Sequence, residues 1–479
     1  MSQRRRFMWR NPKESYIHKI TITETTEGGQ DIACVDRISN LPVDIIRQFL
    51  FRIPPKDIAR TSVLSKKWLS IWASLSDIYL ENGEIGMLFL RMTVDKRSSC
   101  ELLGKRWIDF ALKNKVKTLH LDIKALNYGE PFRLFSLSGF AFSCAILVVL
   151  SIKECEISSS VSFMLPNLRS LFLHNIMTVD GFVFADFIAG CPRIEELIVE
   201  YFPEELDIIL VPNPNLKYLM VEYTAFGGKL QVESKKLESL VFSYLRVEVD
   251  EYVFEIASTS TVKNLTLQKV YVLERTLSPF INRFPLLENL VIDGCRLDVF
   301  SGGVGFDNYL PRLFISHKNL ANFVLKLHTI DSIDEIIIHA PNLKSFEYCG
   351  QLTSFPGIWA SRQLEFVKLH LRPKVLNTRW YIWVRKILES FAHAKHLCLI
   401  CQNEQDIIFP DELTETLLPA INSIKNLELQ IESSTGSTKK ILDGFIWILP
   451  GLKTLSLTLG SVSKIIEVLV NSTWLLSSP

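Results

Sequence analysis

The sequence has little cysteine, almost no net charge and no recognisable secretory signal. Nine cysteines are spread over 479 residues, a small and odd number that argues against a disulfide framework and indicates a reducing compartment. Lysine plus arginine number 53 against 52 acidic residues, which leaves a net charge of +1. A chain this neutral has no overall attraction for nucleic acid or for an anionic membrane. We therefore expect neither partner, and a location in the nucleus, the cytoplasm or both.

Long uncharged runs are also scarce. One run at 134–152, LFSLSGFAFSCAILVVLSI, approaches membrane-spanning length. Several serines and one glycine interrupt it, and its end falls in the repeat described below, so we expect no membrane span. Near the start, a basic run of four arginines fits either a nuclear import signal or a solvated tail. These are Arg4, Arg5, Arg6 and Arg10.

Motifs that mark common enzyme classes are missing. Gly-x-x-x-x-Gly-Lys-Ser/Thr, Gly-x-Ser-x-Gly and His-Glu-x-x-His do not occur. The densest group of potential metal ligands is His393, His396, Cys398 and Cys401. In a continuous strand His396 and Cys398 face one side and Cys401 faces the other, which prevents a tetrahedral site. We therefore expect no metal, no cofactor and no catalytic residue.

The clearest feature is a repeat of the form apolar-x-x-apolar-x-apolar. Its 14 copies begin at 116, 147, 168, 194, 216, 237, 262, 287, 320, 343, 364, 394, 424 and 452. The second position is Lys, Arg or Glu in 12 copies, and only Val148 and Ala321 differ. Since 22% of the chain is charged, chance would place about three charged residues there. The pattern is therefore a true repeat rather than a product of apolar composition.

The spacing within each copy predicts a strand. The last two apolar residues lie two apart and share one strand face, while the charged second residue points to solvent. A single copy leaves its strand unpaired, so only neighbouring copies can complete a sheet, as in a stacked parallel solenoid. Leu171, Leu219, Leu240 and Leu290 should then line one continuous core.

The segments between strands predict the outer side of this solenoid. Residues 180–193 and 275–287 fit short amphipathic helices that end before Pro192 and Pro285. Turns such as LPNL (165), NPNL (213) and APNL (340) precede the strands. With starts 21 to 33 residues apart, the region from about 100 to 460 resembles the plant-type leucine-rich repeat.

Residues 36–80 form a different module. Ile45, Ile46, Phe49, Leu50 and Ile53 follow the spacing of one helix face, and a proline pair ends that helix. A second short helix is predicted up to residue 64. A third starts near 65 and aligns two tryptophans and a leucine on one side. Three short helices give a small core, so such a module usually rests on a partner.

This module resembles the F-box. The motif consists of Leu-Pro, an acidic residue, an apolar helix, a proline-bounded turn and Ser-Val-Leu-Ser-Lys-Lys-Trp. The resemblance implies docking on the Skp-type adaptor of a cullin ubiquitin ligase. The residues carried over to that contact are Leu41, Pro42, Ile45, Ile46, Leu50, Ile53, Pro54, Val63, Leu64, Trp68 and Trp72.

The sequence therefore predicts an α/β protein in three parts. Residues 1–34 form a flexible basic and polar tail, 35–80 a three-helix F-box, and 81–479 a leucine-rich-repeat solenoid with a curved parallel sheet and irregular carboxy-terminal units. The implied function is the substrate receptor of a Skp–cullin–F-box ubiquitin ligase, non-catalytic, with an unknown protein target. Two alternatives are a hormone-like small-molecule receptor carrying an F-box and a binding scaffold that never joins a ligase.

A target surface is predicted on the inner face of the sheet. The residues between and beside the two buried positions face that side. Across consecutive copies they form an apolar stripe edged by acids, which turns more polar beyond residue 347. The stripe could equally be covered, because parallel strands are often apolar on both faces. The candidate target residues are Phe172, His174, Glu196, Ile198, Glu200, Tyr218, Met220 and Glu222.

Overall fold

The computed structural model describes most of the chain from residue 77 onward and three residues before it. The described residues are 41–42, 46, 77–81, 84–94, 99–125, 134–137, 141–158, 160–179, 184–201, 208–211, 213–222, 229–243, 254–256, 261–298, 312–327, 335–350, 357–360, 364–373, 375–410, 412–413, 423–433, 441–442, 448–460, 462–468 and 474–477. The 1–34 tail lies outside these residues.

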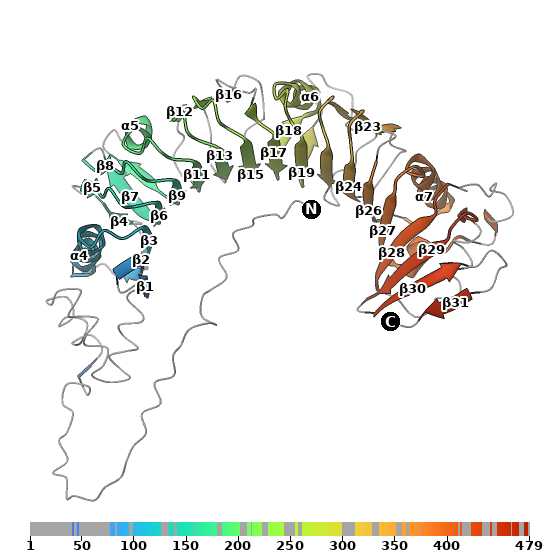
Figure 1. Ribbon diagram of the computed structural model, residues 1–479, viewed down its shortest axis with the longest axis horizontal. Coiled ribbons are helices and arrows are strands. Elements are labelled where there is room, and N and C mark those ends of the chain that lie inside the picture. The colour runs from blue at the N-terminus through green and yellow to red at the C-terminus, as the bar shows by residue number, and fades with distance from the viewer. Residues whose placement is uncertain are drawn as a thin grey trace, which may run out of the picture.

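One long sheet forms the inner side of an arc (Figure 1). Fifteen of its strands pair in parallel, in chain order, and the predicted α/β solenoid with a curved parallel sheet is confirmed. These strands are β2 (Glu84–Val94), β3 (Thr118–Ala125), β6 (Val149–Lys153), β9 (Ser170–His174), β11 (Glu196–Glu200), β13 (Tyr218–Glu222), β15 (Ser239–Ser243), β17 (Asn264–Gln268), β19 (Asn289–Asp293), β22 (Asn322–Lys326), β24 (Ser345–Gly350), β26 (Phe366–Leu371), β27 (His396–Asn403), β28 (Asn426–Ser433) and β29 (Thr454–Leu459).

Antiparallel strands close both ends of the sheet. β1 (Asp77–Glu81) pairs antiparallel with β2, while β30 (Val462–Val468) and β31 (Trp474–Ser477) extend the sheet beyond β29 in the same way. They cover backbone groups that a bare parallel edge would leave unpaired. All 14 predicted copies lie on parallel strands, and β2 adds a fifteenth that the sequence analysis did not count.

The outer side carries short strands and a few helices (Figure 1). The outer strands are β4 (Phe135–Ser136), β5 (Ala141–Ser143), β7 (Cys155–Ser158), β8 (Ser162–Met164), β10 (Met177–Val179), β12 (Ile208–Val211), β14 (Lys229–Val232), β16 (Phe254–Ile256), β18 (Tyr271–Leu273), β20 (Arg296–Asp298), β21 (Arg312–Ser316), β23 (Glu335–Ala340) and β25 (Gly357–Ala360). The helices are α4 (Ser99–Lys113), α5 (Phe184–Ala189), α6 (Glu274–Asn282) and α7 (Thr378–Ser390), with a short 3-10 turn, η3 (Glu404–Asp406). None of these described helices is long and apolar enough to cross a membrane.

Repeat length decides between strand and helix on this side. The predicted helices at 180–193 and 275–287 overlap α5 and α6, so both predictions are confirmed. The longer repeats that hold α5 and α6 also carry the outer strands β10 and β18, whereas the repeats of 21 to 23 residues carry only outer strands in the described part of the chain. A strand advances about 3.3 Å per residue and a helix about 1.5 Å, so a short repeat can cross the solenoid only in extended form.

The core lies between the inner sheet and the outer elements. On β9, β11, β13, β17 and β19 the burial pattern alternates strictly, with the two apolar positions inside, and β15 departs from it only at the buried Ser243. Leu171, Leu219, Leu240 and Leu290 are each at most 1% exposed and pair with their counterparts on adjacent strands. The prediction of one continuous core is therefore confirmed.

Asparagines in several turns tie a repeat to the one before it. Asn167 Nδ2 donates to Ala145 O at 2.6 Å, and Asn215 Nδ2 donates to Pro192 O at 3.1 Å. Asn342 makes the same bond to Lys318 O at 2.8 Å. These hydrogen bonds satisfy carbonyl groups that a tight turn leaves without a backbone partner. The Pro-Asn-Leu turns therefore fix the repeat spacing as well as the chain direction.

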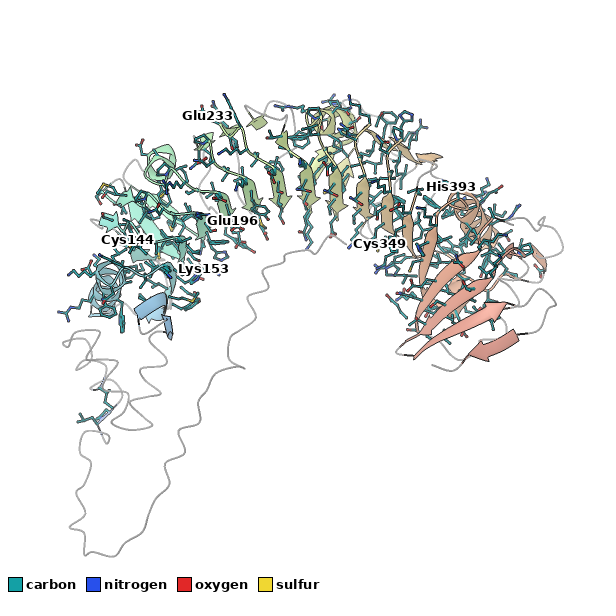
Figure 2. All side chains as sticks on the ribbon, viewed as in Figure 1. Cys144, Lys153, Glu196, Glu233, Cys349 and His393 are labelled. Carbon is teal, nitrogen blue, oxygen red and sulfur yellow. The ribbon has the colours of Figure 1, made fainter. Side chains whose placement is uncertain are left out.

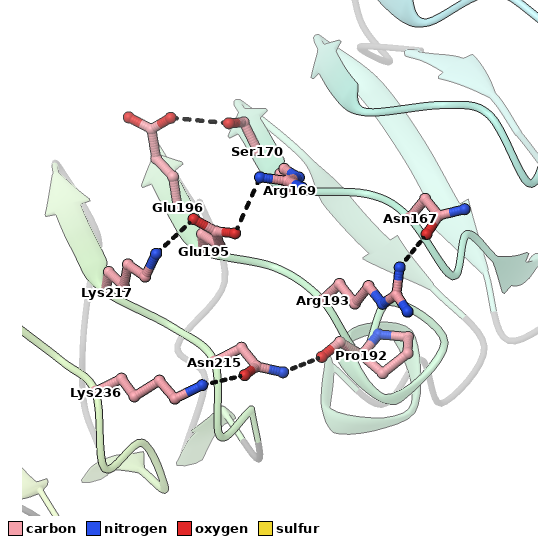
Figure 3. A network of polar contacts seen from close by, with 10 residues as sticks. All are labelled: Asn167, Arg169, Ser170, Pro192, Arg193, Glu195, Glu196, Asn215, Lys217 and Lys236. Atoms are coloured by element: carbon pink, nitrogen blue, oxygen red, sulfur yellow. Dashed lines mark hydrogen bonds and ion pairs between the residues drawn. The ribbon is translucent and has the colours of Figure 1, made fainter.

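The charged second positions form a row on one flank of the sheet, which we call the flank row. Glu195 N donates to Arg169 O, and Lys217 N donates to Glu195 O, both at 2.8 Å. The side chains pair along the same line, with Arg169–Glu195 at 3.4 Å and Lys217–Glu195 at 2.8 Å (Figure 3). Exposed pairs of this kind contribute little stability, but alternation avoids like charges on neighbouring strands.

Candidate functional site

Three rows of side chains cover the inner face of the arc. Each inner strand contributes one residue to a first, a middle and a last row, because the parallel register places equivalent residues side by side. Figure 2 places Glu196 and Cys349 on this inner side and Glu233 on the outer side. The face therefore offers a periodic array in which each repeat can vary three side chains independently of the core.

The middle row is mostly apolar from β9 to β22. Its residues from β9 to β22 are partly exposed rather than covered. In order they are Phe172, Ile198, Met220, Val241, Thr266, Val291 and Val324. In register with one another, they form a stripe that is apolar apart from Thr266. The predicted stripe is present and accessible to solvent.

Acidic side chains edge this stripe on β11 and β13. Glu196 belongs to the first row, where it accepts a hydrogen bond from Ser170 Oγ at 3.0 Å. Glu200 and Glu222 lie next to each other in the last row. Burial and the charge of Glu200 raise the pKa of Glu222 above its ordinary value. The two neighbouring carboxylates thus give this part of the face a negative electrostatic potential.

His174 and Tyr218 lie beside the same glutamates. His174 Nδ1 is 2.8 Å from Glu200 Oε2, and its ring meets the ring of Tyr201 edge-on with centroids 5.0 Å apart. The Tyr218 hydroxyl donates to Met220 Sδ at 3.8 Å. Burial and the three surrounding glutamates raise the pKa of Tyr218 to about 12. The eight predicted target residues therefore come together on three adjacent strands, β9, β11 and β13.

The second half of the face is polar, as predicted. The middle row continues as Glu347 and Lys368 and then reaches Cys398, Glu428 and Ser456. Lys326 Nζ lies 3.3 Å from Glu347 Oε1, so some of these charges are already paired within the chain. The change from an apolar to a polar middle row divides the arc into two surfaces of different chemistry.

An asparagine ladder in the first row was missed from sequence. Asn264 Nδ2 donates to Ser239 Oγ at 2.9 Å. Asn289 Nδ2 donates to Asn264 Oδ1, and Asn322 Nδ2 donates to Asn289 Oδ1, both at 2.6 Å. The signal was asparagine at the same position of three consecutive copies. The ladder joins β15 to β22 and so stiffens the middle of the face.

The potential zinc ligands do not converge. Cys398 lies in the middle row, whereas Cys401 is fully buried on the opposite side of β27. His393 and His396 are exposed. No group of three histidine, cysteine or acidic residues suited to a metal occurs in the described part of the chain. The predicted opposite parity of Cys398 and Cys401 is confirmed.

Three of the predicted adaptor residues are described. Ile46 N donates to Pro42 O at 3.0 Å, the hydrogen bond of a first helical turn, as the sequence predicts. Ile46 is fully buried, Leu41 is partly buried and Pro42 is exposed. The other eight adaptor residues lie outside the described part of the chain. They are Ile45, Leu50, Ile53, Pro54, Val63, Leu64, Trp68 and Trp72.

A curved parallel sheet with one strand per repeat defines the chain as a leucine-rich-repeat solenoid protein. Comparison with known protein families gives one match in the F-box region and one in the repeat region. The F-box domain profile matches residues 38–78, and the profile of the LRR repeats of the FBD-associated F-box protein At5g56370 matches residues 104–258. The chain thus resembles plant F-box/leucine-rich-repeat proteins in both its F-box sequence and its repeats.

Similar proteins occur in Arabidopsis thaliana. The chain is 27% identical to the F-box/FBD/LRR-repeat protein At1g13570 over 65% of its own length and 75% of the relative. It is 26% identical to the FBD-associated F-box protein At5g22730 over 52% of its length, and 24% identical to the F-box/FBD/LRR-repeat protein At4g26340 over 53%. These two matches span 59% and 65% of the relatives.

Proposed function

We propose that the chain is the substrate-receptor subunit of a Skp–cullin–F-box ubiquitin ligase. This proposal rests on one observation: a single chain contains both an F-box sequence and an inner face made of three variable rows. An F-box implies a Skp-type adaptor, and through it a cullin. The receptor itself catalyses nothing, and it raises the effective concentration of the target near the ubiquitin-loaded subunit. Such a ligase acts in the nucleus or the cytoplasm.

The adaptor contact comes from the F-box. Pro42 is exposed at the start of the first helix and Leu41 is only partly buried, which suits an edge that meets a partner. Ile46 is fully buried, which suits support of that edge from within. Buried apolar residues fix the helix, and accessible ones lose their water on binding. We therefore assign Leu41 and Pro42 to the contact itself and Ile46 to its internal support.

The target surface is the first half of the inner face. Its middle row offers apolar area on adjacent strands, and Glu196, Glu200 and Glu222 lie beside it. Burial and the charge of Glu200 raise the pKa of Glu222 even though His174 and Lys269 act to lower it. A complementary target carries an apolar segment flanked by lysine or arginine. Charge complementarity of this kind favours the correct partner and speeds its association.

The experiment combines three serine substitutions in the middle row. Phe172, Ile198 and Met220 become serine in the full chain, which is then purified with a Skp-type adaptor. We expect the adaptor to remain bound and the set of captured proteins to lose members with basic, apolar segments. An unchanged set would show that targets bind elsewhere.

A matched control uses the same row further along the arc. Val241, Val291 and Val324 are also half-buried apolar residues of the middle row, and they lie on β15, β19 and β22 rather than on β9, β11 and β13. Changing these three to serine also removes apolar area from the middle row, although less than the first variant does. We expect that control to keep the targets that the first variant loses. Equal loss in both variants would point to a general defect of the sheet.

A further inference from the structure

The amino terminus combines basic and aromatic residues in one short segment. Residues 4–10, with the sequence RRRFMWR, place the apolar triplet Phe7-Met8-Trp9 between arginines, and the first acidic residue of the chain is Glu14. A nuclear import signal needs only the basic run, and a solvated tail is ordinarily poor in aromatic residues. Neither interpretation accounts for the triplet. We call residues 4–10 the RRRFMWR segment; they lie outside the described part of the chain.

The inner face at β9, β11 and β13 has the matching composition. Phe172, Ile198 and Met220 are partly exposed and in register on these adjacent strands, so they span about 10 Å. Glu196 and Glu200 lie on opposite sides of Ile198, each two residues away along β11, which is about 7 Å. An apolar segment with arginines before and after it can therefore cover the stripe and reach carboxylates on both sides.

The carboxylates of this surface are suited to an added cation. No described lysine or arginine forms an ion pair with the three glutamates. Glu196 accepts a hydrogen bond from Ser170 Oγ at 3.0 Å, and Glu200 Oε2 lies 2.8 Å from His174 Nδ1. Burial and the charge of Glu200 raise the pKa of Glu222. A guanidinium group placed here would relieve that repulsion and form charge-assisted hydrogen bonds, which are among the strongest in proteins.

Other described parts of the inner face fit the segment less well. From β15 to β22 the first row holds only serine and asparagine, and the last row carries a single acid, Asp293. Beyond β22 the middle row itself becomes charged, at Glu347 and Lys368. On the amino-terminal side, β6 places Ser151 in the middle row and Lys153 in the last. Apolar area with acids on both sides therefore occurs at β9, β11 and β13.

The connecting chain is long enough to bring the segment to this surface. Leu41 packs against the hydrophobic core, and about 30 residues separate it from Arg10. Fully extended, 30 residues span about 100 Å. The fifteen parallel strands extend over roughly 70 Å at 4.8 Å per strand, so every strand of the inner face lies within reach. A segment tethered in this way has an effective concentration on the order of a millimolar.

We propose that the RRRFMWR segment is an internal occupant of the inner face at β9, β11 and β13, where it competes with targets. This inference rests on the proposed function, because it assigns a second occupant to the proposed target surface. With an intrinsic dissociation constant of about 0.1 mM, a tethered segment at about 1 mM lowers the apparent affinity of any competitor about tenfold. A target must then match the surface better than the chain's own segment does.

The first test measures that competition. A fluorescein-labelled peptide with the sequence of residues 1–13 is titrated by fluorescence anisotropy into the full chain and into a tail variant. The tail variant carries glutamine at Arg4, Arg5, Arg6 and Arg10 and serine at Phe7 and Trp9. We expect the peptide to bind the tail variant about tenfold more tightly, because its own segment no longer competes. Equal affinity for both chains, or binding to neither, would overturn the proposal.

The second test locates the contact on the chain. In the tail variant, Glu196, Glu200 and Glu222 are changed together to glutamine, which should weaken peptide binding at least tenfold. The matched control changes three exposed glutamates of the flank row, and the net charge changes equally. These are Glu238, Glu288 and Glu365. The control should keep peptide affinity within about twofold, because isolated exposed charges contribute little. Equal weakening in both triple variants would show a general charge effect and overturn the site.

The third test changes the peptide and leaves the protein intact. Serine at Phe7, Met8 and Trp9 keeps every charge of the peptide and removes its apolar area, so binding to the tail variant should weaken at least tenfold. Equal binding of the two peptides would show that charge alone is recognised, which would overturn the assignment to the apolar stripe.

This inference and the proposed function fail in different experiments, because peptide binding needs neither adaptor nor target. Absence of peptide binding, with targets still lost when Phe172, Ile198 and Met220 become serine, would overturn the internal occupant and leave the target surface standing. Peptide binding that requires the three glutamates, with an unchanged set of targets in that serine variant, would support the internal contact and overturn the target surface.

Discussion

Replacing Leu219 by alanine probes the continuity of the solenoid core. Leu219 lies at the centre of β13, is 1% exposed and pairs in register with Leu197 and Leu240. The substitution removes three buried carbon groups, worth about 2.4 kcal/mol in transfer free energy. A residual cavity adds to that loss, because packed neighbours relax only in part, which gives about 2–5 kcal/mol in total.

Urea denaturation of the purified chain measures this loss. In a stacked repeat each unit contacts mainly its neighbours, so the weakened unit should lower the midpoint and reduce cooperativity across the arc. Met220→Ala is the matched control, because Met220 is the next residue on the same strand and is half-buried on the inner face. We expect the control to cost clearly less. A loss below about 1 kcal/mol for Leu219→Ala, or equal losses for the two variants, would refute the buried core assigned to this strand.

Two further predictions concern the adaptor contact and the acidic surface. Leu41→Asp combined with Pro42→Asp should abolish co-purification with a Skp-type adaptor while leaving the solenoid folded, because both lie at an accessible edge. Undiminished co-purification would rule out that edge as the contact. Glu222→Gln should raise the melting temperature at neutral pH. The pKa of Glu222 is raised in the folded chain, so ionisation costs stability as pH rises above the ordinary value of 4.5, and the gain should vanish at acid pH. A lower melting temperature of Glu222→Gln at neutral pH would contradict the claim that the ionised Glu222 destabilises the fold.

The inner strands were predictable because their signal is redundant. Two buried apolar positions, a fixed offset and a charged neighbour recur in each copy, and burial then follows from strand geometry alone. β2 was missed although Ile85, Leu88 and Leu90 have the same apolar spacing. Gly86 occupies the position that is usually charged, so the most diagnostic element of the pattern is absent.

The outer side was predictable only in part. α5 and α6 follow from amphipathic spacing, even though α6 contains Pro279. The outer strands are three to six residues long in most repeats, too short for a periodic signal, and their formation depends on pairing with the next repeat. Repeat length carried the missing information, since it limits how the chain can cross the solenoid.

The side-chain contacts at the candidate site could not be predicted from the sequence. The inner-face residues could be placed by strand parity, and all eight fall on β9, β11 and β13 or at their ends. The His174–Glu200 contact and the asparagine ladder depend on side-chain direction across strands, which parity does not give. The flank row differs, because its alternating charges can be read from the sequence. The structure adds that these residues are neighbours on adjacent strands.

The central claim is that one chain separates ligase attachment from target capture. Proximity labelling in plant cells tests it most directly, with the cullin ligase inhibited so that targets persist. The Leu41→Asp, Pro42→Asp variant should lose the adaptor and keep the targets. The variant with serine at Phe172, Ile198 and Met220 should keep the adaptor and lose targets. Loss of adaptor and targets together in either folded variant, or an unchanged set of targets in the second, would contradict the account.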